Sequence, residues 1–198
     1  GRRRIERTLG RYVPAAVADR LIADDSARAP QERLASILVL DIAGFSTWSA
    51  GRAPGDVIAA LNTFLARAAQ AVDAAGGVVI QYTGDGLLAT FGTPLECPDP
   101  PAAARDAAGR LRGLQDAFRI RIGIATGPVA SGSIGSSDRQ AFTVYGETVN
   151  RAARLEAAAK DLGVDVLMDA ARSAGGGPVT SLALRGLGDP VAVFELPR

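Results

Sequence analysis

Two stretches decide the fold: Leu34-Ala-Ser-Ile-Leu-Val-Leu-Asp41, an apolar run that ends in an aspartate, and Tyr82-Thr-Gly-Asp85-Gly86, a tight turn built around a second aspartate. A short apolar run of this kind is typical of a buried strand. A Gly-Asp-Gly turn is typical of the tip of a hairpin. Each stretch therefore places a carboxylate at the tip of a strand. Carboxylates are hard oxygen ligands, so two of them brought together would suit Mg2+ carrying a substrate phosphate.

Outward from these stretches the sequence alternates between strand and helix patterns. Apolar residues recur at helical spacing from Val57 to Val72, and Gly76-Gly77 is expected to end that helix. The order β-α-β-β-α-β predicts an α+β fold with a ferredoxin-like core. The expected elements are strand 34–40, helix 55–74, strands 78–82 and 87–91, helix 102–117 and strand 120–126.

The connections predict which strands are neighbours. A right-handed crossover makes the first two strands point the same way, and the third strand then lies antiparallel between them. The hairpin tip should therefore lie beside the end of the first strand, with Asp85 close to Asp41. The alternative is that Asp85 simply suits a turn and that Asp41 is a cap beside a helix, because aspartate is favoured in both places.

The rest of the chain predicts one domain, residues 31–198, preceded by a lead-in at residues 1–30 with a short helix at 15–22. Three adjacent arginines near the start would suit either a membrane flank or a solvated basic arm. The expected C-terminal additions to the core are a polar loop 131–140, strand 141–144, helix 147–160, strands 164–168, 181–184 and 191–194, and a flexible break at 175–178.

Composition excludes several functions. The 22 Lys and Arg residues nearly balance the 21 Asp and Glu residues, so nucleic acid is not the expected partner. An RNA-binding sheet would also need exposed aromatic residues, which make up only 5% of the chain. The absence of histidine excludes a Ser-His-Asp triad and imidazole-ligated zinc. The single Cys97 predicts a reducing, cytoplasmic compartment. The sequence contains no run of about 18 apolar residues, so no membrane span is predicted. The missing initiator Met suggests a fragment of a longer protein.

The helix expected at 147–160 contains an arginine without a local partner. Arg151 has Glu147 four residues earlier, which predicts an ordinary exposed pair, and Lys160 has Glu156 in the same relation. Arg154 has no acidic residue three or four positions away. Its guanidinium is therefore available for an anion from outside the helix, although a solvated arginine would show the same pattern.

Two further features suit a phosphate ligand. Asp41 is followed by Ile42-Ala-Gly44-Phe45-Ser46, a turn of small residues in which Gly44 lets the backbone approach a ligand closely. Backbone N–H groups there would form a cradle for a triphosphate. Asn150 lies one turn before Arg154 on the same helix face, where a better helix former would be expected unless the amide has a role. An incidental asparagine near a helix start is the alternative.

Taken together, these motifs resemble the class III nucleotidyl cyclases, of the bacterial type. The resemblance covers about residues 34–196, and the segment at residues 9–14 is similar to the one that precedes the catalytic domain in members with membrane-bound sensor modules. The motifs that carry it are Leu40-Asp-Ile-Ala-Gly-Phe-Ser46, Gly76-Gly77 with Thr83-Gly-Asp85, Arg121-Ile-Gly-Ile-Ala-Thr-Gly127, and Phe142-Thr-Val-Tyr-Gly-Glu-Thr-Val-Asn-Arg-Ala-Ala-Arg-Leu-Glu156.

The resemblance implies a homodimer that converts a nucleoside triphosphate into a 3',5'-cyclic nucleotide and pyrophosphate. Asp41 and Asp85 match the metal-binding aspartates, with the Ile42 carbonyl as a further ligand for two Mg2+ or Mn2+ ions per active site. Asn150 matches the residue that orients the ribose, and Arg154 the one that stabilises charge on the α-phosphate. In the family each site takes its aspartates from one chain and its Asn-Arg helix from the other.

The choice of purine departs from the family pattern. The adenine-selecting lysine is replaced by Gln81, and its aspartate partner by Thr143, which a bacterial subgroup also has. Both side chains donate and accept hydrogen bonds, so they could satisfy either purine. The resemblance favours an adenylate cyclase, with a guanylate or mixed-specificity cyclase, or a weakly active nucleotide-binding regulatory domain, as the alternatives. Arg185 lies where the family often has a phosphate-binding lysine. A cytoplasmic catalytic domain, tethered to the membrane through an upstream sensor module, would fit the lead-in.

Overall fold

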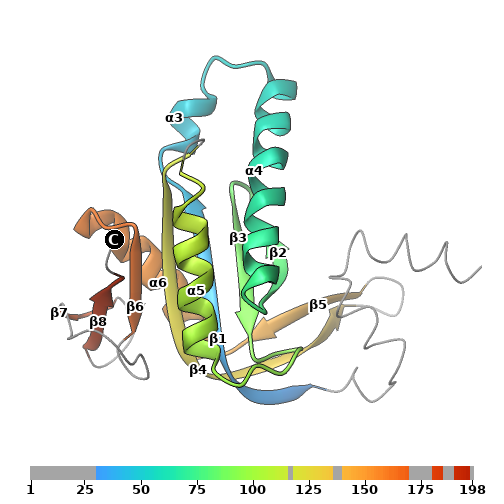
Figure 1. Cartoon of the computed structure of the whole chain (residues 1–198), viewed down its shortest axis with the longest axis vertical. Coiled ribbons are helices and arrows are strands. Elements are labelled where there is room, and N and C mark those ends of the chain that lie inside the picture. The colour runs from blue at the N-terminus through green and yellow to red at the C-terminus, as the bar shows by residue number, and fades with distance from the viewer. Residues whose placement is uncertain (1–29, 116–117, 136–139, 170–179, 185–189, 197–198) are drawn as a thin grey trace, which may run out of the picture.

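A mixed β-sheet runs through the molecule, and helices cover both of its faces (Figure 1). The computed structural model describes residues 30–115, 118–135, 140–169, 180–184 and 190–196. The strands are β1 (Gln31–Ile42), β2 (Val78–Tyr82), β3 (Gly86–Phe91), β4 (Ile120–Gly135), β5 (Gln140–Tyr145), β6 (Val166–Asp169), β7 (Thr180–Leu182) and β8 (Val191–Glu195). The helices are α3 (Phe45–Ser49), α4 (Pro54–Ala74), α5 (Pro100–Arg112) and α6 (Glu147–Leu162).

The strand order is β2-β3-β1-β4-β6-β8-β7, with β5 paired to β4. β3 is antiparallel to both β1 and β2 and lies between them, so β1 and β2 point the same way, as the crossover rule predicts. β4 pairs antiparallel with the other edge of β1. This confirms the ferredoxin-like core. The added C-terminal elements are also confirmed: α6 follows β5, and β6, β8 and β7 extend the sheet.

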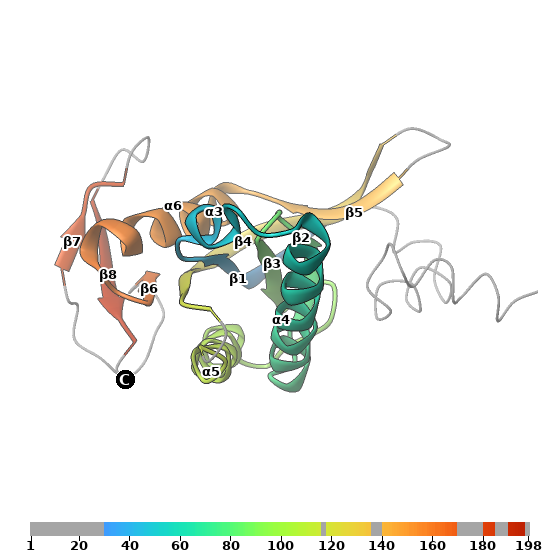
Figure 2. The ribbon, with the colours of Figure 1, turned by 90° about the horizontal axis from the view of Figure 1, so that it is seen from above.

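Alternating residues of the central strands build two separate cores. Leu38, Leu40 and Ile42 of β1 pack into the core that α4 and α5 cover. Ile37 packs into the core on the opposite face, beneath α6. Figure 2 shows α4 and α5 on one side of the sheet and α6 on the other. Asp41 alternates with Leu40 and Ile42, so it lies on the α6 side.

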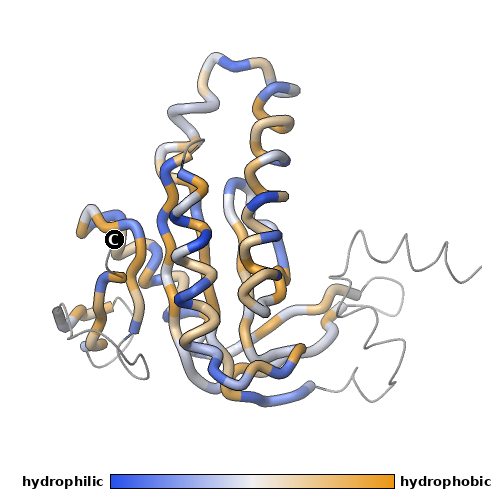
Figure 3. The backbone as a smooth tube through the Cα atoms, in the orientation of Figure 1, coloured by the Kyte–Doolittle hydropathy of each residue, from blue (hydrophilic) through white to orange (hydrophobic). Residues whose placement is uncertain are grey.

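Local sequence explains where the two long helices of the first core begin. α4 starts with Pro54 in its first turn, where the missing N–H costs no hydrogen bond. Its buried face repeats at helical spacing, and Figure 3 shows the resulting alternation of apolar and hydrophilic residues. The side chain of Asp99 caps α5 by accepting from the Ala102 N–H. Within the described residues, no helix is long and apolar enough to cross a bilayer.

The structure corrects the sequence predictions in three places. Residues 131–135 are not a loop, because β4 continues to Gly135 and pairs with β5 as a two-stranded arm that projects from the body of the molecule (Figure 1). α5 ends at Arg112 rather than near residue 117, and Gly113 follows it. The short helix α3 stands where only a turn was expected. The helix predicted at 15–22 and the break at 175–178 lie outside the described residues.

Candidate active site

The two aspartates lie close together at the ends of neighbouring strands because of the register between β1 and β3. Asp41 pairs directly with Gly86, so Asp85 lies immediately beside the end of β1. The fit requires glycine at position 86, since a Cβ there would lie 2.0 Å from the Leu40 carbonyl oxygen. The predicted proximity of Asp41 and Asp85 is thus confirmed, while their roles as metal ligands stay a prediction.

Arg121 links Asp41 to helix α6. It is the cross-strand partner of Asp41 in the β1–β4 ladder, and its Nη2 donates to Asp41 Oδ2. Its Nε donates to Glu156 Oε1 at 2.9 Å. The side chains of Arg121, Asp41 and Glu156 are 17%, 30% and 15% exposed. We call these three residues the Glu156–Arg121–Asp41 chain.

The charges in this region act on one another strongly. Burial raises the pKa of Asp41, and the nearby negative charges of Asp85 and Glu156 raise it further, against the opposing effect of Arg121. Burial lowers the pKa of Arg121, but its hydrogen bonds and charge interactions with Glu156 and Asp41 raise it overall. Arg121 is therefore a permanent cation between Asp41 and Glu156, two carboxylates that repel each other.

The donor atoms at these strand ends fit a hard divalent cation. The repulsion that raises the pKa of Asp41 is the charge that a cation between Asp41 and Asp85 would neutralise. Both side chains offer only oxygen, as Mg2+ and Mn2+ prefer. In the part of the chain that the structure describes, no three His, Cys, Asp or Glu side chains gather into a metal-binding group. A site here would accordingly combine two carboxylates with backbone carbonyls, such as that of Ile42.

The turn after Asp41 has the backbone that a phosphate cradle needs. Gly44 has a φ of +72° and precedes α3, and its carbonyl accepts from the Trp48 N–H at 3.0 Å. The ring of Phe45 stacks on Trp48 at 5.6 Å and meets Phe118 edge-on at 6.2 Å. The Phe45 ring is therefore partly buried against the core that α4 and α5 cover. Ser46 is exposed.

Asn150 and Arg154 both lie on α6, as predicted. Asn150 is exposed in the first turn, and Arg154 is half-buried. The Nη1 atom of Arg154 is buried and has no hydrogen-bond partner in the described structure. Among the described residues, neither side chain forms a hydrogen bond or ion pair with Asp41 or Asp85. Within the described part of one chain, the two halves of the predicted site are therefore not joined by such a contact.

The local pairs predicted along α6 are wrong. Arg151 does not pair with Glu147 but donates from Nε to Asp169 Oδ2 at 2.8 Å and from Nη2 to the Thr126 carbonyl at 2.9 Å. Glu156 pairs with Arg121 rather than with Lys160, the second partner expected from helical spacing. Both true partners come from distant strands, so helical spacing could not reveal them. The signals that could have done so are an arginine and an aspartate within otherwise apolar strands.

The residues predicted to choose the purine lie on two strands that contact each other, β2 and β5. Gln81 is exposed and pairs with Leu88 of β3. Thr143 is half-buried and pairs with Gly132 on the arm. No hydrogen bond joins Gln81 to Thr143 in the described structure. Arg185 lies outside the described residues.

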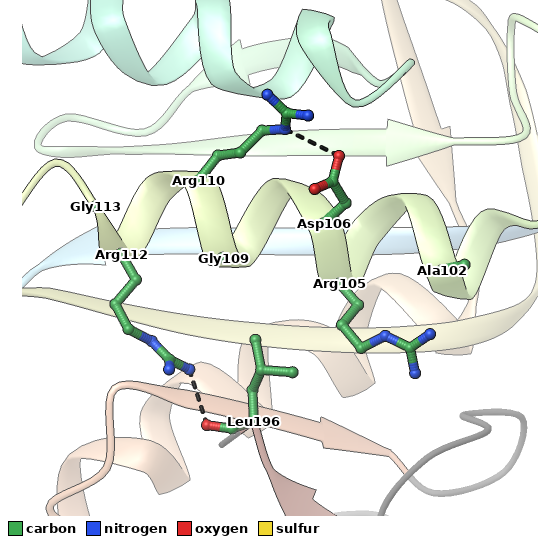
Figure 4. Close-up of a pocket in the computed structure, with 8 residues that line it drawn as sticks. All are labelled: Ala102, Arg105, Asp106, Gly109, Arg110, Arg112, Gly113 and Leu196. Atoms are coloured by element: carbon green, nitrogen blue, oxygen red, sulfur yellow. Dashed lines mark hydrogen bonds and ion pairs between the residues drawn. The ribbon is translucent and has the colours of Figure 1, made fainter. Parts of the chain in front are cut away.

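A groove of about 850 Å³ runs along α5 and is separate from this site (Figure 4). Arg110 pairs there with Asp106 at 2.9 Å, and Arg112 donates to the Leu196 carbonyl at 2.8 Å. α5 and Leu196 belong to the core opposite α6. The groove therefore lies on the other side of the sheet from the Glu156–Arg121–Asp41 chain.

Comparison with known proteins gives consistent matches. A family model described as the adenylate and guanylate cyclase catalytic domain matches residues 28–175. An uncharacterized protein of Mycobacterium tuberculosis is 37% identical over 158 residues, which cover 78% of this chain and 29% of the relative. Adenylate cyclase 1 of Rhizobium meliloti is 33% identical over 179 residues, covering 83% of this chain and 27% of that protein. The chain thus spans less than a third of the length of these relatives.

Solved structures share the fold over most of their length. The adenylyl cyclase CyaB from P. aeruginosa superposes with a TM-score of 0.73 at 23% identity, covering 84% of this chain and 95% of that one. The guanylyl cyclase Cya2 superposes with a TM-score of 0.67 at 27% identity, covering 83% of this chain and 92% of that one.

Proposed function

The chain belongs to the adenylate and guanylate cyclase catalytic domain family, and from this premise we propose that it converts ATP into 3',5'-cyclic AMP and pyrophosphate. The observation that carries the proposal is the β1–β3 register, which sets Asp85 beside Asp41 where these two strands meet the turn between β2 and β3. The 33% identity to Adenylate cyclase 1 of Rhizobium meliloti supports ATP as the substrate.

In this proposal Asp41 and Asp85, together with the carbonyl of Ile42, would hold the metal ions. Two divalent cations, when bound there, would lower the pKa of the ribose 3'-hydroxyl and neutralise the triphosphate. The 3'-oxygen attacks the α-phosphorus, and the bond between that phosphorus and the oxygen leading to the β-phosphate breaks. The backbone N–H groups that follow Gly44 cradle the phosphates at the start of α3.

The proposed active site is shared between two chains. Arg154 stabilises the negative charge that builds on the α-phosphate, and Asn150 orients the ribose. The buried Nη1 of Arg154 without a partner supports this role, because a preorganised cation facing a developing anion is a large catalytic term. Neither residue forms a hydrogen bond or ion pair with the aspartates of its own chain in the described structure, and we assign both to the active site formed with a second copy.

GTP is the second candidate substrate. Gln81 stands exposed on β2, and a carboxamide can both donate to and accept from a guanine edge. The guanylyl cyclase Cya2 is 27% identical to this chain. We further propose that a sensor or membrane module precedes the catalytic domain in the whole protein, because the relatives are more than three times as long as the matched segment.

A cyclisation assay with ATP and GTP, each with Mg2+ and with Mn2+, tests these proposals. We expect cyclic AMP to form, with turnover of ATP exceeding that of GTP. A preparation that binds the triphosphate but releases no cyclic nucleotide would refute the catalytic proposal. A GTP turnover above that of ATP would replace the first substrate with the second.

A further inference from the structure

One guanidinium serves two carboxylates in the Glu156–Arg121–Asp41 chain. Nε of Arg121 is held by Glu156 at 2.9 Å, while Nη2 reaches Asp41 Oδ2. Nε and Nη2 are separate donors of the guanidinium, so each carboxylate has a hydrogen bond of its own. The hydrogen bond from Arg121 to Asp41 can therefore break while the one to Glu156 keeps the guanidinium in place.

A divalent cation at Asp41 would compete with Arg121 for the same carboxylate. The side chains are largely shielded from solvent, with exposed fractions of 15% to 30%. Their charges therefore act on one another more strongly than at an open surface. Glu156 offsets the charge of Arg121 and thereby weakens its hold on Asp41. Without Glu156, no neighbouring negative charge would offset Arg121, and its attraction for Asp41 would be stronger.

The structure assigns Glu156 the role of a positioning residue that, through Arg121, sets how tightly Asp41 binds a divalent cation. The inference rests on the proposed metal site at Asp41. It does not require Glu156 to touch the cation.

Close packing keeps Glu156 in place relative to the sheet. A Cβ on Gly123 would lie 2.2 Å from both the Ala152 carbonyl oxygen and the Glu156 backbone nitrogen, so α6 lies directly on the backbone of β4. Arg121 is two residues before Gly123 on the same strand and faces the same side. Glu156 is thus fixed at the distance from which it can hold Arg121.

The alternative is that Glu156 only anchors α6 to the sheet. Glu156→Gln separates the two roles, because the carboxamide oxygen can still accept from Nε of Arg121 while the negative charge is lost. If Glu156 only anchors the helix, this substitution should have little effect on metal binding. If Glu156 sets the metal affinity of Asp41, the substitution should weaken metal binding.

The test is a titration of the nucleotide-free protein with Mn2+ alone, in which electron paramagnetic resonance measures the free ion. Asp41→Asn first shows which binding belongs to this site. We expect Glu156→Gln to weaken that binding about tenfold, the effect of one charge removed near a divalent cation in a partly screened site. Arg121→Gln should strengthen it, and the double variant should bind at least as tightly as the wild type. Asp161→Asn, which removes an exposed charge from the same helix, should stay within about twofold.

Equal Mn2+ affinity in Glu156→Gln and Asp161→Asn would overturn the inference. Weaker binding in the double variant, to the level of Glu156→Gln, would overturn it too, since removing Arg121 should relieve the competition. If Arg121→Gln does not fold, as judged by circular dichroism, the double variant supplies the same comparison. A wild-type titration that Asp41→Asn leaves unchanged would instead refute the proposed metal site, and with it the proposed function.

Discussion

Gly123→Ala is expected to push helix α6 away from the sheet. A Cβ at this position would meet the Ala152 carbonyl oxygen and the Glu156 nitrogen at 2.2 Å, about 1 Å closer than such atoms normally approach. Both obstacles are backbone atoms, so no side chain can swing aside, and the helix or the strand must move. Forced overpacking of this kind costs about 1–3 kcal/mol, and we expect the upper end because the backbone of α6 is rigid.

The same displacement should impair catalysis, because α6 carries Asn150 and Arg154. A misplacement of about 1 Å at catalytic groups can cost about a hundredfold in rate. Urea unfolding measures the loss of stability, and kcat/KM for cyclic nucleotide formation measures the loss of activity at a temperature where the variant stays folded.

Gly109→Ala is the matched control. Gly109 is an exposed glycine within α5, and a Cβ there would meet nothing within 4 Å. Alanine in an open helical position should stabilise the protein by about 0.5–1 kcal/mol and leave turnover unchanged. If Gly123→Ala matched this control in both stability and activity, the direct backbone contact between α6 and β4 would be wrong.

Other variants test the remaining contacts. Arg151→Ala should lower the free energy of unfolding by about 1–3 kcal/mol in urea titrations, because the 3%-exposed Asp169 carboxylate loses one of its hydrogen-bonded partners; an effect under about 0.5 kcal/mol would contradict this. Gly86→Ala should separate β3 from β1, and the loss of both stability and Mn2+ binding would be measured against the wild type. Asp41→Ala and Arg154→Ala should each be inactive as purified proteins, and their mixture should regain partial cyclase activity; confirmed heterodimers without activity would argue against shared sites. Because the folded-state pKa of Asp41 is raised, its ionisation costs stability as the pH rises through that pKa. Asp41→Asn should therefore raise the urea midpoint at pH 7, and the gain should vanish in acid, below the unfolded-state pKa of aspartate; a gain that persists there would contradict the sign.

The proximity of Asp41 and Asp85 could be predicted because it follows from the geometry of one turn and one crossover. A tight turn fixes one hairpin, and the handedness of a single crossover fixes where that hairpin lies. Together these rules place Asp85 beside the strand that ends near Asp41, although the two residues are far apart in sequence. The register that pairs Asp41 with Gly86 bears this out.

The arm and the long-range ion pairs could not be predicted in the same way. Residues 131–135 were predicted as a loop because they lack the hydrophobic alternation that marks a strand. That alternation reflects a core beneath the strand, and a projecting two-stranded arm has little core beneath it. The partners of Arg151 and Glu156 come from β6 and β4, which only the folded sheet brings to the helix. Helical spacing offered nearer partners for both side chains. The stronger desolvated pairs with the sheet prevailed over those exposed ones.

Helix α6 divides its residues between two tasks. Arg151 and Glu156 face the sheet and tie the helix to Asp169 and Arg121, while Gly123 lets the backbones touch. In the proposed dimer, the same helix offers Asn150 and Arg154 to the partner. A helix held at two points by partly buried ion pairs presents those side chains in a fixed geometry before the second chain arrives. Such preorganisation lowers the reorganisation needed at the reacting phosphate. Because Arg121 also contacts Asp41, the helix that serves one active site is joined, within one chain, to the carboxylate that serves the other.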